Sequence, residues 1–416
     1  MPRLAWQRTM SRPAAGRVAC LLAATVALLG GCNGESTPAP PTPPALTRAD
    51  APTIRVKIGN SLPQARVSIR DKYQIRDTGS RRILCAGDSL SNAIFAAADG
   101  TLRLDGLPLG THQVTVVPQQ SGSLLVAGQA YRGNLFVFAE AGKVTLVNHL
   151  DFEEYLASVV GAELLRGWQL ETHKAQAIAA RSYALYHMKN VSAAARFDVG
   201  DTPGHQVYRG VASESETSRR AIEVTRGIVL ATDEGGPKRI FEAFYHSTCD
   251  GRTVPAYTEW PRAPRIRPLG GVVCPWCAKS PGYEWARRIG SQTLARLLQP
   301  QDAKLKAMKN ITKAWVDKDS LTATGNVKGV WITPDRGGNY LVKTSAFKDC
   351  FPAGQRILSD RFSVSMVGSE VVVSGRGHGH AVGMCQYGAE EMANQGRRAE
   401  QILGFYFPGS ILDKVY

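Results

Sequence analysis

Residues 53–150 alternate apolar and polar side chains in short runs that glycine, aspartate and proline separate. Clear examples are Ile54–Ile58 (IRVKI), Gln113–Val117 (QVTVV) and Leu135–Phe138 (LFVF). A period of two residues is typical of antiparallel strands with one buried and one exposed face. The sequence therefore predicts a β-rich N-terminal region at 53–143, either a sugar-binding platform or packing for the remainder.

The hydrophobic period changes at Asp151. Asp151 and Glu154 are spaced as a capping pair at the start of a helix, and apolar residues then recur at steps of three and four. These apolar positions are Phe152, Tyr155, Leu156, Val159 and Val160. The pattern predicts a short helix that carries the chain towards Glu163.

A second, longer helix is predicted over Glu171–Lys189, which is rich in residues that favour helices. Lys174 and Arg181 are seven residues apart, and this spacing places them on the same side of a helix. The helix that follows Glu163 in the sequence therefore has two cations on one face.

The remainder of the chain mixes both periods. Strands are predicted at 224–232, 240–247, 330–358 and 362–374, a mixed region containing a helix at 294–309, and a final helix at 387–395. This order is not that of a parallel doubly wound sheet. The predicted fold class is mixed α+β and strand-rich, with the larger domain over 144–416.

The first 32 residues have the layout of an export signal. Four arginines and no acid precede an apolar run, Val18–Leu29, which is too short to cross a bilayer. The run ends at Gly30-Gly31-Cys32 and resembles a lipobox, in which Cys32 receives lipid; an ordinary signal with a chance cysteine is the alternative. Residues 33–52 are crowded with proline, threonine and serine, which predicts a disordered tether. We expect an exported protein that is lipid-anchored to a bacterial membrane.

The net charge of +15 changes the choice of partner. Removing the four arginines of the signal leaves +11, so the mature chain stays basic. An exported lipoprotein rarely meets nucleic acid, which leaves anionic lipid or an acidic wall polymer as binding partners. General solubility is the alternative explanation.

Glu163 is the candidate general acid. Its apolar neighbours Val159, Val160 and Ala162 disfavour the charged form and so raise its pKa. Lys174 and Arg181 oppose that rise if they lie close to it. The two cations then either face carboxylates of a substrate or bond Glu163 and backbone carbonyls as structural groups.

Five runs, in this order, resemble the SpoIID/LytB family of cell-wall proteins. The runs are Glu153–Leu156, Val159–Glu163, Lys174–Ala184, Tyr245–Thr253 and Gly375–Ala389. The resemblance extends from the strand-rich region through nearly the whole C-terminus. Three positions depart from the family pattern: Gly161 and Leu164 replace the common proline and methionine, and Cys385 stands where serine is frequent.

The resemblance implies a lytic transglycosylase that cuts the β-1,4 bond after N-acetylmuramic acid in peptidoglycan, preferring glycan strands without stem peptides. Glu163 would act as acid and then as base, without a cofactor. Lys174 and Arg181 would bind the free lactyl carboxylate. The other groove residues would be Gln386, Tyr387, His378 and His380, although the two histidines are alternatively turn residues or metal ligands.

Two other functions stay open. Some members of the family are described as amidase enhancers, so the chain is alternatively a non-catalytic glycan-binding lipoprotein that works with an N-acetylmuramoyl-L-alanine amidase. The third option is a zinc hydrolase that uses His378, His380 and a cysteine.

Four further residues have the donor types that zinc prefers. His246 with Cys249, and Cys274 with Cys277, form two pairs with a short spacing inside each pair. Together they predict a closed structural Zn²⁺ site of one imidazole and three thiolates. The alternative is a disulfide that includes Cys249 or joins Cys274 to Cys277, with His246 in the substrate groove.

Overall fold

The computed structural model describes residues 51–202 and 204–416. The described chain divides into two compact units, Gly59–Leu146 and residues 51–58 together with Val147–Tyr416. The predicted signal, Cys32 and all but the last two residues of the predicted tether lie outside the described residues. Within the described part of the chain, none of the helices combines the length and apolar character that crossing a bilayer requires.

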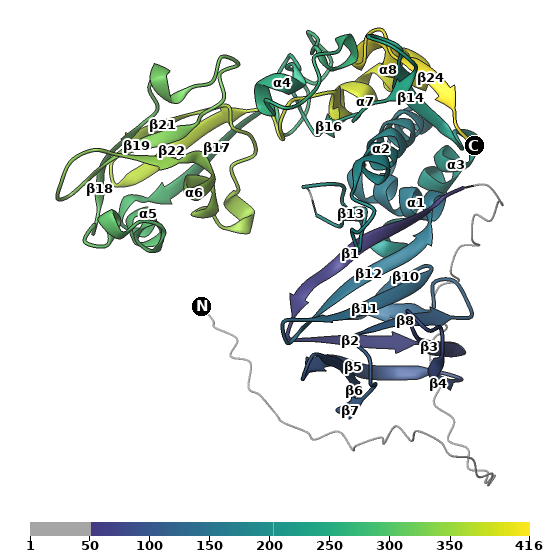
Figure 1. The fold of residues 1–416 in the computed structure, drawn as a ribbon. Helices are drawn as coiled ribbons and strands as arrows, with labels where there is room; N and C mark the ends of the chain where they lie inside the picture. The colour runs from purple at the N-terminus through teal and green to yellow at the C-terminus, as the bar shows by residue number, and fades with distance from the viewer. Residues whose placement is uncertain (1–50, 203) are drawn as a thin grey trace, which may run out of the picture. The chain divides into compact units, whose positions relative to one another are not determined.

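The first unit consists of short strands in two sheets (Figure 1). One sheet has the order β10-β9-β2-β5-β6-β7, and in the other β11, β8, β3 and β4 are neighbours. Their bounds are β2 Gln64–Ile69, β3 Tyr73–Asp77, β4 Ile83–Gly87, β5 Leu90–Ala98, β6 Thr101–Leu104, β7 Leu107–Pro108, β8 Gln113–Pro118, β9 Leu124–Val126, β10 Gln129–Tyr131 and β11 Asn134–Glu140. In β2 the alternate residues Ala65, Val67 and Ile69 are buried, so the predicted strand pattern is confirmed.

Strands β1 (Thr53–Leu62) and β12 (Lys143–Asp151) each run from one unit into the other. Within the second unit, β1 pairs in parallel with β13 (Val199–Gly200) through Val56 and Lys57. Arg55 Nη2 and Asp198 Oδ1, 2.6 Å apart, form an ion pair next to this β1–β13 pairing, also within the second unit.

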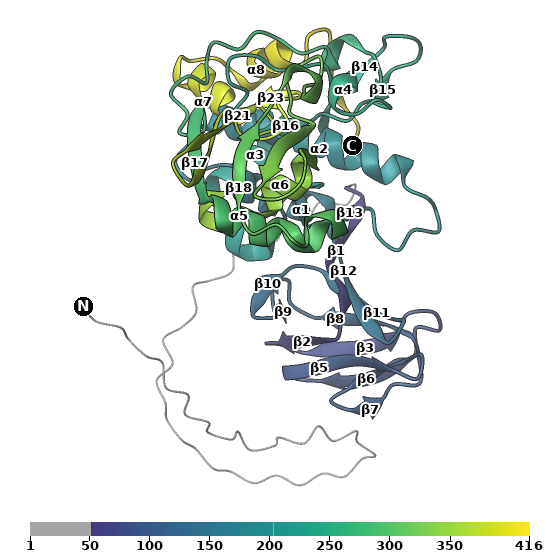
Figure 2. The ribbon, with the colours of Figure 1, turned by 90° about the vertical axis from the view of Figure 1, so that its left-hand side faces the viewer.

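Helices α1 (Phe152–Glu163) and α2 (Leu170–Asn190) confirm the two helix predictions. The Asp151 side chain accepts hydrogen bonds from the backbone N–H groups of Glu153 and Glu154, which supplies the predicted N-cap. Both helices pack on each other and on α3 (Glu216–Val224), as Figures 1 and 2 show. The sequence did not predict α3, which begins at a Ser215–Ser218 capping box and takes up the start of an expected strand.

The remaining elements around α2 come from distant parts of the chain. β16 (Tyr245–His246) pairs in parallel with β23 (Met384–Cys385), and α7 (Gln386–Asn394) and α8 (Ala399–Tyr406) both pack on α2. The other elements here are β14 Ile228–Thr232, β15 Arg239–Ile240, α4 Ala256–Glu259 and β24 Ile411–Lys414. The predicted final helix is confirmed as α7.

Residues 284–376 form a subdomain of the second unit with its own apolar core. Two three-stranded sheets, β17-β22-β21 and β18-β19-β20, surround it together with two helices. The bounds are β17 Glu284–Gly290, α5 Ser291–Leu298, β18 Ile311–Trp315, β19 Gly329–Pro334, β20 Tyr340–Lys343, α6 Thr344–Asp349, β21 Phe362–Val367 and β22 Glu370–Arg376. The strand predicted over 330–358 is wrong at α6, because Phe347 meets this core from a helical turn and not from a strand. The mixed α+β, strand-rich class is confirmed.

Candidate active site and thiol cluster

Glu163 is the last residue of α1, and its side chain lines a cavity of about 1060 Å³. The Val207 N–H donates to Oε1 at 3.0 Å, and Gln386 Nε2 lies 3.4 Å from Oε2. Burial raises the pKa of Glu163 above its ordinary value, although these two hydrogen bonds act in the opposite direction. A raised pKa keeps a carboxyl group protonated and able to donate, as a general acid requires.

Four other predicted groove residues line the same cavity: Gln386, Tyr387, His378 and His380. They reach it because β16 pairs in parallel with β23, so that the segment leading into α7 lies beside Tyr245 and His246. The structure thus gathers residues that are more than two hundred positions apart in sequence.

Two aromatic pairs form walls of the cavity. Trp168 and Tyr387 meet edge to face with ring centroids 4.9 Å apart, and Phe244 and Trp260 stack at 4.4 Å. Flat aromatic faces with a polar edge suit the apolar faces of sugar rings. Sequence reasoning identified only Tyr387, since the three others stand outside recognisable motifs.

Burial disfavours the charged form of two histidines in the cavity lining. His246 Nδ1 donates to the Val382 carbonyl at 3.0 Å, and the pKa of His246 is well below its ordinary value, mainly because it is buried. Burial likewise lowers the pKa of His380 to about 4, and its Nδ1 accepts from the Val382 N–H. The His380 ring is therefore a neutral imidazole near neutral pH, and burial acts on His246 in the same direction.

Arg181 does not lie where the sequence predicts. Its guanidinium donates to both carboxylate oxygens of Glu153, at 3.0 and 2.8 Å, and to the Ile228 carbonyl at 3.0 Å. Both side chains of this ion pair are fully buried. The predicted substrate-binding role of Arg181 is therefore wrong. Its side chain stabilises the packing of α1, α2 and β14, and none of its surface is exposed to a substrate carboxylate.

Lys174 also lies outside the cavity lining. Its Nζ is 2.6 Å from Glu171 Oε1, one turn earlier on α2, and the other oxygen of Glu171 accepts from the Ala399 N–H at the start of α8. The predicted pair of substrate-binding cations is therefore replaced by one buried and one surface ion pair.

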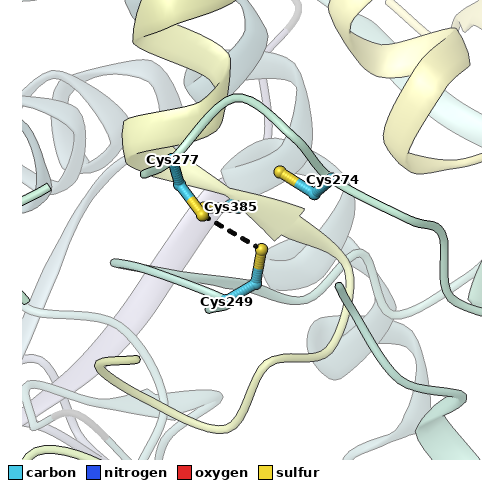
Figure 3. A group of neighbouring side chains, drawn as sticks. All are labelled: Cys249, Cys274, Cys277 and Cys385. Atoms are coloured by element: carbon cyan, nitrogen blue, oxygen red, sulfur yellow. Dashed lines mark hydrogen bonds between the residues drawn. The ribbon is translucent and has the colours of Figure 1, made fainter. Parts of the chain in front are cut away.

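Four buried thiols form a cluster, which Figure 3 shows. The sulfur atoms of Cys249, Cys274, Cys277 and Cys385 all lie within 4.8 Å of one another. Tetrahedral Zn–S bonds of about 2.3 Å place sulfurs about 3.8 Å apart, so the donor set fits zinc closely. The hydroxyl of Tyr406, 3.1 Å from the Cys274 sulfur, adds a second layer of hydrogen bonding.

This cluster corrects the predicted ligand set. Cys385 takes the place given to His246, whose ring is tied to Val382 instead. Among the described residues all six cysteines are free thiols, and no histidine joins a group of three or more potential metal ligands. The departure of Cys385 from serine was the signal for the fourth thiol of the cluster, but Cys385 is too far along the chain from the other three for a spacing rule to identify it.

The structure shows why position 161 is glycine in this chain, where the family pattern has proline. A Cβ at this position would lie 2.1 Å from the carbonyl oxygen of Ser213. We expect Gly161→Ala to lower the free energy of unfolding by about 1–3 kcal/mol, because the backbone atom it meets cannot move aside. The matched control is Gly404→Ala in α8, where nothing lies within 4 Å and alanine should stabilise the helix by up to about 1 kcal/mol. Urea unfolding followed by circular dichroism measures both, and equal effects at the two sites would contradict the packing argument.

Comparison with known proteins places this site inside a recognised sequence family. Residues 140–231, which include α1, Glu163 and α2, match the family model for the stage II sporulation protein SpoIID. The chain is 30% identical over 284 residues to stage II sporulation protein D of Bacillus subtilis, covering 64% of this chain and 75% of the relative. It is 26% identical over 424 residues to the amidase enhancer of the same organism, covering 85% of this chain and 56% of that protein. An uncharacterized protein of Brachyspira hyodysenteriae is 27% identical over 321 residues, covering 77% and 82%.

Proposed function

Because the chain belongs to the stage II sporulation protein D family, we propose that it is a cell-wall enzyme, a lytic transglycosylase acting on peptidoglycan glycan strands. The observation that carries the proposal is a single carboxyl group with a raised pKa, Glu163, at the edge of an aromatic-walled cavity. The bond cut is the β-1,4 bond after N-acetylmuramic acid, and the preferred strands are those without stem peptides.

One carboxyl group suffices for this reaction. Glu163 protonates the leaving oxygen as the C1–O4 bond breaks, and the resulting carboxylate then takes the proton of the C6 hydroxyl. The freed O6 bonds to C1 and closes a 1,6-anhydro ring, so no water is consumed. The Val207 N–H and Gln386 hold the carboxyl group in place through both steps.

The cavity contains a second carboxylate, which matters because ordinary glycoside hydrolysis uses two acids. Glu242 lines the cavity, but its Oε1 is 2.8 Å from His187 Nε2 and the pair forms part of the wall. We assign Glu242 no role in the proton transfers. Anhydro-terminated products, as opposed to ordinary reducing ends, separate the two mechanisms.

The runner-up is a glycan-binding enhancer of an N-acetylmuramoyl-L-alanine amidase, and the similarity to an amidase enhancer favours it. Product analysis distinguishes the two functions. The purified protein is incubated with peptide-free and with peptide-bearing glycan strands, and mass spectrometry follows 1,6-anhydro ends. We expect such ends mainly from the peptide-free strands. Strands that are bound but left intact would support the enhancer instead.

The four thiols are proposed to hold one structural zinc ion, with all four positions occupied and none left for a catalytic water. We expect about one zinc per chain by elemental analysis, and a lower melting temperature after chelation or in Cys274→Ser. Cys350→Ser is the matched control, since Cys350 is buried outside the cluster. A metal-free protein whose melting temperature a chelator leaves unchanged would refute the zinc site.

We further propose that the protein is exported and anchored to a bacterial membrane by lipid on Cys32, with residues 33–52 as the tether. The anchor would keep the cavity within reach of the wall while an amidase removes stem peptides. Metabolic labelling with a fatty-acid analogue should mark the protein, and Cys32→Ser should remove the label.

A further inference from the structure

The cavity lining contains two arginines, and neither of them is a predicted cation. Its charged lining residues, apart from Glu163, are Glu242, Arg262 and Arg287. Glu242 is hydrogen-bonded to His187, and burial raises the pKa of Glu163. The two arginines are the positive charges that an anionic ligand in the cavity would meet.

The two arginines differ in how much of their hydrogen-bonding capacity is used. Arg287 donates from Nε to the Arg356 carbonyl at 3.0 Å and from Nη1 to the Ala286 carbonyl at 2.8 Å. Arg262 is exposed at the cavity, and within residues 51–202 and 204–416 its guanidinium has no hydrogen bond, ion pair or ring contact. None of its five N–H donors therefore has a partner among these residues.

The backbone that carries Arg262 is fixed. Pro261 and Pro264 flank it closely, and the Ala263 N–H donates to the Trp260 carbonyl at 2.8 Å, which closes a turn around the arginine. Trp260 itself is held by stacking on Phe244. A free guanidinium on a rigid turn next to an aromatic wall is preorganised for a ligand that has both a sugar face and an anionic group.

We propose that Arg262 is the residue that binds the carboxylate of the glycan substrate, the role that the sequence assigned to Lys174 and Arg181. The inference rests on the proposed function, because the lactyl group of a peptide-free muramic acid supplies that carboxylate. An arginine fork matches a carboxylate with two parallel hydrogen bonds. When a stem peptide occupies the lactyl group as an amide, this charge is absent, and Arg262 thereby selects peptide-free strands.

The test measures binding and not turnover, so that it does not depend on catalysis. Glu163→Gln protein is titrated with peptide-free glycan strands, and with the same strands after their carboxylates have been converted to amides. We expect Arg262→Ala, added to this background, to raise the Kd for the carboxylate strands roughly tenfold, the size of one charge-assisted contact. The Kd for the amidated strands should not change, and Arg262→Lys should recover part of the loss.

The matched control is Arg265→Ala. Arg265 is an exposed arginine three positions along, whose guanidinium lies over the Tyr257 ring at 4.1 Å and does not line the cavity. It should leave both Kd values unchanged. Equal losses for Arg262→Ala and Arg265→Ala, or the same loss on both kinds of strand, would overturn the assignment and leave the proposed function intact. Failure of the Glu163→Gln protein to bind either strand would overturn both.

Discussion

Glu163→Gln is expected to lower the rate of anhydro-end formation by about 10²–10⁴-fold, the usual contribution of a positioned general acid and base. Glutamine keeps the size of the side chain and its contact with the Val207 N–H, but it cannot donate and recover a proton. The measurement is a time course of 1,6-anhydro ends released from peptide-free glycan strands. Strand binding and the melting temperature should stay close to those of the unmodified protein.

The comparison that sharpens this result is Glu242→Gln, which removes the other carboxylate of the cavity. We expect it to retain anhydro-forming activity. A loss as large as that of Glu163→Gln, together with ordinary reducing ends in the unmodified protein, would indicate two-carboxylate hydrolysis in place of the proposed reaction.

The pH profile gives a second measure of the same group. Glu163 must be protonated when the reaction begins, and its pKa is raised in the folded protein. Activity should therefore be full below that raised pKa and fall as the pH rises through it. The residual activity of Glu163→Gln should lack this alkaline limb, and an unchanged limb would assign it to another group.

Arg181→Ala is expected to lower the free energy of unfolding by about 3–5 kcal/mol, because it leaves the Glu153 carboxylate buried without its partner. Lys174→Ala breaks a partly exposed pair on the same helix and should cost less than about 1 kcal/mol. Denaturant unfolding curves of the two variants measure both. Replacing both members of the buried pair, in Glu153→Leu with Arg181→Met, should recover much of the loss.

Arg181→Ala also distinguishes a structural role of Arg181, in the ion pair with Glu153, from a role in binding substrate. If Arg181→Ala unfolds normally but no longer binds peptide-free strands, then the cation faces substrate after all, and the buried pair is not its main partner. A destabilised variant whose folded fraction still binds strands supports the placement in the structure.

The sequence predicted helix α1 and its end at Glu163 well, because Asp151 caps the helix and the apolar period leads directly to Glu163. The sequence also predicted Gln386 and Tyr387 as groove residues, because they belong to a long glycine-rich motif, and both line the cavity. It failed at Arg181 for a physical reason. Helical spacing shows which way a side chain points, but not that Glu153 on another helix stands opposite.

Other errors have the same origin in long-range contacts. Cys385 lies beside three thiols from a different part of the chain because β23 pairs with β16. Arg262 lies in an exposed loop without periodicity, so only the folded structure places it in the cavity lining. The segment of α6 was predicted as a strand because its local sequence pattern does not show which core it packs on. In the structure, Phe347 packs on the core of the 284–376 subdomain from a helix.

A single peptide bond joins Cys385, one of the four clustered thiols, to Gln386, whose side-chain amide lies 3.4 Å from Glu163 Oε2. We therefore expect oxidation of these thiols to displace Gln386 and to disturb its contact with Glu163. The number of free thiols should therefore be measured in every preparation in which the activity of Glu163 is tested.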